Sequence, residues 1–412
     1  MREAPPPLVV GVGHVAKVVK SAVRDGQIHM QATRRVFSLG ALATLLSACG
    51  GGASRGQSAV TAARAPDPVM QAVPNAGWEA WVASFRGRAA AQGIGQGTLD
   101  TAFRGAGFLP DVIERDRNQT ETSRTLEEYL AIAASDERVA KGRANYARYR
   151  DVLARIEAQY GVEAHVVTAI WGLESMYGER RGNVPVVSAL STLAYEGRRG
   201  AFFEDQLVGA LKILQNGDTT PGNMTGSWAG AMGHTQFIPT SYLAFAVDFT
   251  GDGRRDIWSD DPTDSLASTA AYLSRSGWRR GQAWGGEEGS PGAASGTRSI
   301  QPQAGGPVFR VGPNFTAIKR YNNSDSYAIG VGHLSDRIIG AGPIRGSFPP
   351  DRYGMTADDR KALQQRLTAA GYDTGGADGV LGAKSRAAIS AYQQRNGLPV
   401  TGEPSLDLLS RL

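Results

Sequence analysis

Apolar residues recur at helical spacing along most of the chain. The pattern opens at Trp78, with Trp81 and Phe85 on the same face of a helix, because positions three and four apart share one face. The same spacing predicts helices over 124–160, 162–178, 185–195, 201–215 and 264–276. Strand signals are short and few, such as PVFRV at 307–311. The pattern therefore predicts a mainly α (α+β) protein.

Stretches rich in glycine, serine, alanine and proline divide this pattern. Residues 50–75 have too few apolar side chains to fold and predict a flexible linker. Residues 285–306 interrupt the large helical unit and predict a loop or a small β flap. A second linker is predicted at 346–354. The chain then divides into one large unit over 76–345 and a small module over 355–412.

The module over 355–412 has its own helix signals. Thr356 can cap a first helix that ends near Gly371, and 385–398 predicts a second helix. D-G-x-x-G and A-I-x-x-Y-Q features are present at Asp378, Gly379, Gly382, Ala388, Ile389, Tyr392 and Gln393. These features resemble the peptidoglycan-binding domain type 1 family. The resemblance implies a small three-helix domain that binds the cell wall.

The N-terminal region resembles a bacterial export signal. Two arginines precede the apolar run VFSLGALATLL (36–46), which is too short to span a bilayer. The small residues LSAC follow and resemble a lipobox, in which Cys49 becomes the lipidated first residue. We therefore predict a lipoprotein signal peptide over 30–49, with an ordinary signal peptide and an incidental cysteine as the alternative. Residues 1–29 fit no targeting pattern and are interpreted as a mis-assigned extension.

Charge and residue counts exclude several classes of protein. The net charge of +5 is concentrated in residues 1–48, so the remainder is close to neutral and does not favour nucleic acid. The single cysteine rules out a disulfide within the chain. The five histidines are scattered and no H-E-x-x-H motif is present, which argues against a zinc peptidase or amidase.

An ionisable side chain interrupts the apolar helix that ends in AIWGLESMYG (169–178). Glu174 lies four residues after Ile170 and three after Trp171, so it shares their buried face. Burial raises the pKa of a carboxyl, and a carboxylic acid that is still protonated near neutral pH can donate its proton. The alternative is a glutamate at the helix end that turns to solvent or pairs with Arg180 or Arg181.

Five sequence motifs occur one after another along the chain, and together they indicate a family. They are AIWGLESMYG, LSTLAYEGRRGAFFEDQL (190–207), GSWAGAMGHTQFIPTSY (226–242), VDFTGDGRRDIW (247–258) and AIKRYNNSDSYAIGVGHL (317–334). Together they resemble the membrane-bound lytic murein transglycosylase B family. The resemblance implies a lysozyme-like helical catalytic domain that cleaves peptidoglycan between MurNAc and GlcNAc without water. It also implies that Glu174 acts first as the acid and then as the base, leaving a 1,6-anhydroMurNAc end.

The resemblance assigns further residues to substrate binding. They are Ser227, Gln236, Tyr321, Asn322, Arg198, Arg199, Tyr129 and Tyr272. The two arginines would bind carboxylates of the peptide or the lactyl group, because a planar guanidinium suits an oxyanion. Each position also has a structural alternative, such as a core tyrosine at Tyr272 or a turn residue at Ser227.

The segment VDFTGDGRRDIWSDDPTD also resembles an EF-hand loop. Its oxygen ligands would come from Asp248, Thr250, Asp252, Asp256 and the carbonyl of Arg254. Position 12 is Ser259 in place of the usual glutamate, and Asp264 is the candidate that closes the loop. We expect a structural Ca²⁺ or Na⁺ there, with a metal-free turn as the alternative, and no required cofactor.

These observations predict a periplasmic, monomeric enzyme that is anchored by lipid at Cys49, with the outer membrane as the expected site. Its partners would be peptidoglycan glycan strands and the membrane. Two alternatives stay open: a hydrolytic muramidase that uses Glu174 with water, and a non-catalytic lipoprotein that binds the cell wall.

Overall fold

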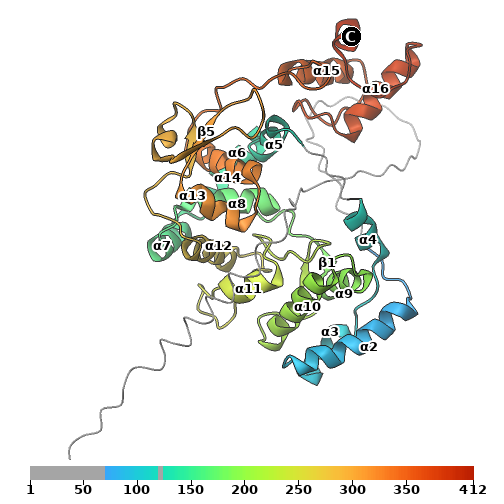
Figure 1. The fold of residues 1–412 in the computed structure, drawn as a ribbon, viewed down its shortest axis with the longest axis vertical. Coiled ribbons are helices and arrows are strands. Elements are labelled where there is room, and N and C mark those ends of the chain that lie inside the picture. Colours follow the sequence, from blue (N-terminus) through green and yellow to red (C-terminus); the bar gives the residue numbers. More distant parts are fainter. Residues whose placement is uncertain (1–69, 119–123) are drawn as a thin grey trace, which may run out of the picture. The chain divides into compact units, whose positions relative to one another are not determined.

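The computed structural model describes residues 70–118 and 124–412 (Figure 1). The predicted signal peptide, Cys49 and the extension over 1–29 lie outside these residues. Within the described residues no helix is both long enough and apolar enough to cross a membrane. Helices dominate and strands are short, so the mainly α prediction is confirmed.

One hydrophobic core lies among helices from two separate parts of the sequence. These are α2 (Ala76–Ala91), α3 (Gln96–Phe103), α4 (Pro110–Arg117), α9 (Val186–Glu196), α10 (Gly200–Gln215) and α11 (Pro239–Phe245). Asn75 caps α2 by accepting a hydrogen bond from the backbone nitrogen of Trp78 at 2.9 Å. Phe85, Leu207 and Tyr242 are fully buried here and anchor the helices to one another.

A second core surrounds helix α8 (Ala164–Ser175). Its other helices are α5 (Leu126–Ala133), α6 (Asp136–Arg148), α7 (Arg150–Tyr160), α12 (Thr263–Arg275), α13 (Pro313–Tyr321) and α14 (Asp325–Ile338). Helix α8 contacts α6, α7, α12 and α14. Its residues are therefore apolar on nearly every side, as expected for a helix enclosed by others.

Two small antiparallel sheets complete the large unit. Strand β1 (Val184–Pro185) pairs with β2 (Thr225–Gly226). The second sheet has the order β3 (Gly285–Glu287), β5 (Phe309–Val311), β4 (Arg298–Ile300), with the 3₁₀ helix η1 (Pro291–Ser295) between β3 and β4. The flap predicted in 285–306 is therefore a three-stranded sheet completed by 309–311.

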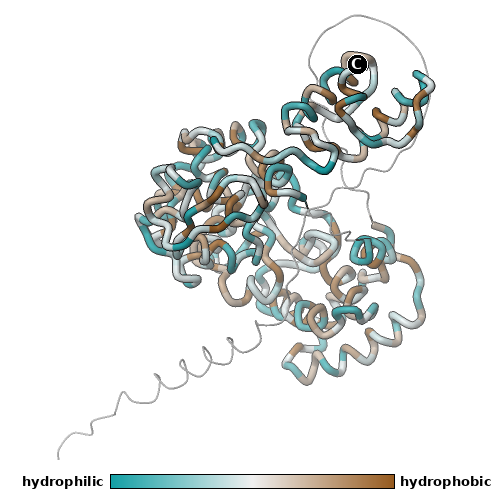
Figure 2. Tube along the Cα trace, turned by 45° about the horizontal axis from the view of Figure 1, so that its top comes forward, coloured by the Kyte–Doolittle hydropathy of each residue, from teal (hydrophilic) through white to brown (hydrophobic). Residues whose placement is uncertain are grey.

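The C-terminal segment forms three helices, α15 (Ala357–Ala369), α16 (Ala383–Arg395) and α17 (Leu406–Arg411). Thr356 and Asp359 form a capping box at the start of α15. The core of this module contains Leu363, Leu367 and Ile389, all fully buried. Apolar and hydrophilic residues alternate along its helices, as expected when each helix buries one face (Figure 2).

Candidate active site

Glu174 lies in the last turn of α8, where the enclosed helix reaches its end. Its side chain is partly buried, and its neighbours Leu173 and Ser175 are buried. Burial raises the pKa of the Glu174 carboxyl to about 7, because a low-dielectric site penalises the anion. Among the described residues no second carboxylate contributes to this shift. Glu174 is therefore positioned to hold a proton near neutral pH.

Tyr327 of α14 is the direct partner of Glu174 and was missed by the sequence analysis. Its hydroxyl donates a hydrogen bond of 2.6 Å to Glu174 Oε1, which favours the anion and partly offsets the effect of burial on the pKa. A signal was present, because Ser324 caps the helix and places Tyr327 on its buried face. A buried phenol needs a hydrogen-bond partner.

Two of the predicted tyrosines lie near Glu174. Tyr129 is on α5, and Tyr321 is at the end of α13. The pKa of each is raised, mainly by burial and to a smaller extent by the nearby charge of Glu174. Tyr272 lies edge-on to Tyr321 with ring centroids 4.9 Å apart. Asn322 follows Tyr321 directly and caps α13. The tyrosines near the Glu174 carboxyl therefore come from three helices: Tyr129 from α5, Tyr321 from α13 and Tyr327 from α14.

The segment 232–237 accepts hydrogen bonds from two helices of this site, α8 and α13. Ser175 donates its hydroxyl to the carbonyl of His234 at 2.5 Å, and Tyr321 donates to the carbonyl of Thr235 at 2.6 Å. Gln236 follows with φ of 55°. Among the described residues only Met176, Tyr177 and Gln236 combine a side chain with a positive φ, a costly conformation that concentrates at functional sites.

The side chains of Ser227 and Gln236 both form hydrogen bonds with nearby backbone atoms. Ser227 Oγ accepts from the backbone nitrogen of Ala231 at 3.1 Å, which leaves its proton for another acceptor. Gln236 Nε2 donates to the carbonyls of Arg181 and Gly233, each at 2.9 Å. Both side chains are partly buried. Their predicted contacts with sugar stay predictions.

The two predicted arginines lie at the start of α10, a helix of the other core. Arg198 donates from Nε to Asp116 Oδ2 at 2.9 Å and from Nη2 to the Asp116 carbonyl at 2.7 Å. The guanidinium of Arg199 lies 4.5 Å from the ring centre of Phe202. Arg199 is the N-cap residue of α10 and Arg198 precedes it, so these contacts fix both arginines at the start of the helix. Their role in binding carboxylates stays a prediction.

The predicted metal loop is folded around its own carboxylates. Asp248 accepts hydrogen bonds from the backbone nitrogens of Gly251, Asp252 and Gly253 at 2.6, 3.2 and 2.8 Å. Asp264, which is buried, accepts from the backbone nitrogens of Phe249, Thr250 and Asp256 at 2.9, 3.0 and 3.0 Å.

The donors of this loop are all oxygen, which suits a hard cation such as Ca²⁺. The part of the chain that the structure describes contains no cluster of three acidic, histidine or cysteine side chains arranged around a metal position. The loop therefore has the oxygen ligands that a Ca²⁺ site needs. In this structure the carboxylates of Asp248 and Asp264 accept hydrogen bonds from backbone nitrogens of the loop.

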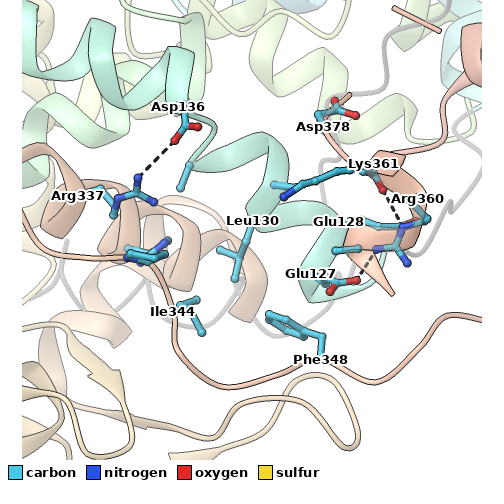
Figure 3. Close-up of a pocket in the computed structure, with 16 residues that line it drawn as sticks. Glu127, Glu128, Leu130, Asp136, Arg337, Ile344, Phe348, Arg360, Lys361 and Asp378 are labelled. Carbon is cyan, nitrogen blue, oxygen red and sulfur yellow. Dashed lines mark hydrogen bonds and ion pairs between the residues drawn. The ribbon is translucent and has the colours of Figure 1, made fainter. Parts of the chain in front are cut away.

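The described residues also line two cavities. One, of about 400 Å³, is lined by Arg181, Gly182, Asn223, Thr225, Gly233, Trp258, Ser259 and Asp260. The other, of about 380 Å³, adjoins α5 and contains two ion pairs, Arg337–Asp136 and Arg360–Glu127 (Figure 3). No predicted site residue lines either cavity, but Gln236 adjoins the first one, because it donates to the carbonyls of Arg181 and Gly233.

Comparison with known protein families shows which family the chain belongs to. The family model of the transglycosylase SLT domain matches residues 77–299 and 286–336. The chain belongs to this family. A peptidoglycan-binding domain model matches residues 356–412. Both resemblances found in the sequence are therefore confirmed.

Individual relatives support the same assignment. The membrane-bound lytic murein transglycosylase B of Escherichia coli (strain K12) is 35% identical over 222 residues, which cover 46% of this chain. The chain spans 61% of the length of that relative.

Solved structures extend the likeness to the fold. A structure of SltB3 from Pseudomonas aeruginosa in complex with NAG-anhNAM-pentapeptide is 43% identical, with a TM-score of 0.64. It covers 82% of this chain and 99% of its own. The Escherichia coli lytic transglycosylase Slt35, in complex with calcium, is 28% identical with a TM-score of 0.53, and the match covers 64% of this chain and 93% of that one. The lysozyme-like fold prediction is confirmed.

Proposed function

We propose that the protein is a peptidoglycan lytic transglycosylase that cleaves the β-1,4 bond between MurNAc and GlcNAc. The observation that carries the proposal is the Glu174 carboxyl, whose pKa is raised to about 7 by burial and which contacts the Tyr327 hydroxyl at 2.6 Å. Such a group can give up a proton and take one back at the same pH.

In the first step Glu174 donates its proton to the glycosidic oxygen. The bond between that oxygen and C1 of MurNAc breaks, and its electron pair leaves with the GlcNAc oxygen. Positive charge develops on the MurNAc ring while Glu174 becomes an anion. The Tyr327 hydroxyl stabilises that anion, because a hydrogen bond to a carboxylate favours the charged form.

In the second step the Glu174 carboxylate removes the proton of the MurNAc C6 hydroxyl. The C6 oxygen then bonds to C1 and closes the 1,6-anhydro ring, and Glu174 is protonated again. Glycosidases that use water rely on two carboxylates. The proposed reaction needs only the Glu174 carboxyl, because the C6 hydroxyl of MurNAc is itself the nucleophile.

Hydrolysis at the same glutamate is the alternative from the same chemical class. SltB3 was solved with a ligand that contains an anhydro sugar, which supports the transglycosylase reaction for this chain as well. A cell-wall-binding protein without activity would not need a carboxyl with a raised pKa in a ring of tyrosines.

The C-terminal module is proposed to keep the enzyme on its polymer. It belongs to a peptidoglycan-binding family, and linking a binding module to an enzyme raises the effective concentration of substrate. We further propose that the enzyme is a periplasmic monomer anchored by lipid at Cys49. The Escherichia coli relative is named as a membrane-bound enzyme, which supports membrane association.

We also propose that Asp248, Thr250, Asp252, Arg254, Asp256 and Asp264 form a weak structural Ca²⁺ loop. The oxygen donors and the calcium complex of Slt35 support this role. A bound cation would rigidify the loop and supply no chemistry to the reaction at Glu174.

The test of the proposed reaction is digestion of purified sacculi by the full chain, followed by mass analysis of the released muropeptides. The proposal predicts 1,6-anhydroMurNAc ends. Reducing MurNAc ends would establish the hydrolytic alternative, and an absence of released fragments would support the binding-protein alternative.

A further inference from the structure

The backbone directly after Glu174 takes an unusual turn. Met176 and Tyr177 have φ of 51° and 59°, so two successive residues with side chains are left-handed. The turn closes α8 with hydrogen bonds from the nitrogen of Met176 to the Gly172 carbonyl at 3.1 Å and from the nitrogen of Tyr177 to the Trp171 carbonyl at 3.3 Å. Such strain persists only where surrounding contacts hold it.

Tyr177 provides the strongest of these contacts. Its hydroxyl donates a hydrogen bond of 2.8 Å to the carbonyl of Arg138 on α6. Its ring lies against two glycines, because a Cβ at Gly142 would come within 2.4 Å of the hydroxyl and one at Gly172 within 2.5 Å of the ring. The ring therefore packs between α6 and α8 in a space that exists because Gly142 and Gly172 have no side chain.

Arg138 carries the connection onward to α5. Its side chain is buried, and its Nη1 donates to the Ile132 carbonyl in the last turn of α5. A cation at a helix C-terminus interacts favourably with the exposed carbonyls. Among the described residues, the buried Arg138 Nε has no hydrogen-bond partner. Helix α5 in turn carries Tyr129, which lies near Glu174.

We propose that Tyr177 and Arg138 form a brace that holds the end of α8 against α5 and so positions the Glu174 carboxyl among its tyrosines. Both are positioning residues, since neither contacts the carboxyl itself. The inference rests on the proposed transglycosylase reaction and deepens it, because it names what fixes the acid in place.

The titratable groups that act on Glu174 come from three helices. They are Tyr327 of α14, Tyr129 of α5 and Tyr321 of α13, while Arg138 of α6 faces Tyr129 and Tyr177. Loss of the brace would let the last turn of α8 relax toward solvent. Glu174 would then be better hydrated, and its pKa would fall toward the ordinary value.

The test compares Tyr177→Phe with Tyr242→Phe in the full chain. Both remove a single hydroxyl that donates to a backbone carbonyl. Tyr242 donates to the Arg255 carbonyl at 2.5 Å in the other core, beside Asp218. For Tyr177→Phe we expect kcat on sacculi to fall about ten-fold with little change in KM, as for a misplaced acid. The alkaline limb of its pH profile should also move to lower pH. Tyr242→Phe should keep the wild-type kcat and pH limb.

An unchanged kcat and pH limb in Tyr177→Phe would overturn the brace. If that variant does not fold, Arg138→Lys carries the test, because it keeps the carbonyl that Tyr177 contacts and removes the guanidinium. The same loss of kcat and the same shift of the limb are expected, and wild-type values would contradict the proposal.

Failure of the proposed reaction is distinguishable from failure of the brace. A wild-type chain that releases no muropeptides would reject the reaction. Carboxyl infrared titration, using Glu174→Gln to identify the Glu174 band, tests the brace without activity. A lower midpoint in Tyr177→Phe supports it, and an unchanged midpoint contradicts it.

Discussion

Glu174 and Asp248 carry the same functional group in opposite surroundings. Glu174 is enclosed at the end of α8, accepts one hydroxyl hydrogen bond, and has its pKa raised to about 7 by burial. Asp248 is exposed and accepts three backbone hydrogen bonds and one from the Thr250 hydroxyl. Desolvation would raise the pKa of Asp248, but these hydrogen bonds together lower it.

The difference shows how one chain assigns two tasks to carboxyl groups. A carboxyl with few donors and little water exchanges its proton near neutral pH, which suits acid and base catalysis. A carboxyl surrounded by backbone donors stays ionised, which suits loop structure and cation binding. The environment, and not the residue type, separates the two roles.

The largest expected effect is the loss of activity in Glu174→Gln. The amide has nearly the same shape but cannot donate a proton as an acid, so muropeptide release should fall by about 10³-fold or more. Release from sacculi, measured by chromatography, checks this. Glu204→Gln is the matched control, because Glu204 forms a surface ion pair with Arg88 and should retain activity. If Glu174→Gln kept a tenth of the wild-type rate, another group would have to be the acid.

A smaller loss is expected for Tyr327→Phe. The hydroxyl lowers the pKa of Glu174 and stabilises its anion, so its removal should reduce kcat by about 10- to 100-fold. The alkaline limb of the pH profile should move to higher pH, opposite to the shift expected for Tyr177→Phe. Kinetics between pH 5 and 9 check both signs. A limb that moves to lower pH would show that solvent entry outweighs the lost hydrogen bond.

Glu174→Gln should also change stability in a pH-dependent way. The pKa of Glu174 is higher in the folded state than its ordinary 4.5, so the wild-type carboxyl progressively destabilises the fold as pH rises from about 4.5 through 7. The variant should therefore gain about 1–3 kcal/mol in free energy of unfolding at pH 8 and nothing at pH 4. Urea unfolding at the two pH values measures the difference. Equal changes at both would remove the evidence for a raised pKa.

The smallest expected effect concerns the loop of Asp248. Calcium should raise the Tm of the wild-type chain by about 2–4 °C, because a ligand that binds only the folded state stabilises it. Asp248→Asn should abolish the shift, since it removes a charge from the loop, while a substitution at the exposed Asp260 should retain it. Scanning calorimetry with and without calcium decides this. An identical Tm in wild type with and without calcium would assign the loop a purely structural role.

Much of the fold followed from the sequence because helical spacing is a local signal. The helices predicted over 162–178 and 264–276 correspond to α8 and α12, and the flap appeared where glycine and proline interrupted the pattern. The pairing of β3 with β5 was not predictable, because such short strands are selected by long-range contacts. The domain boundaries stay predictions.

The site was only partly visible in the sequence. Glu174 stood out because a carboxyl on a buried helix face is rare, and motifs supplied Tyr129 and Tyr321. Tyr327 was missed because its role depends on α14 packing against α8, a contact between residues 153 positions apart. The pairing of Arg198 with Asp116 was hidden for the same reason, since the two lie 82 positions apart.

The protonation state of Glu174 tests the proposed acid most directly. Carboxyl infrared spectra of the full chain, recorded from pH 4 to 9 with Glu174→Gln as the reference, isolate the titration of this one group. A midpoint near pH 7 is expected. A midpoint near 4.5 would mean that the carboxyl is an ordinary solvated anion, and the proposed acid would be absent.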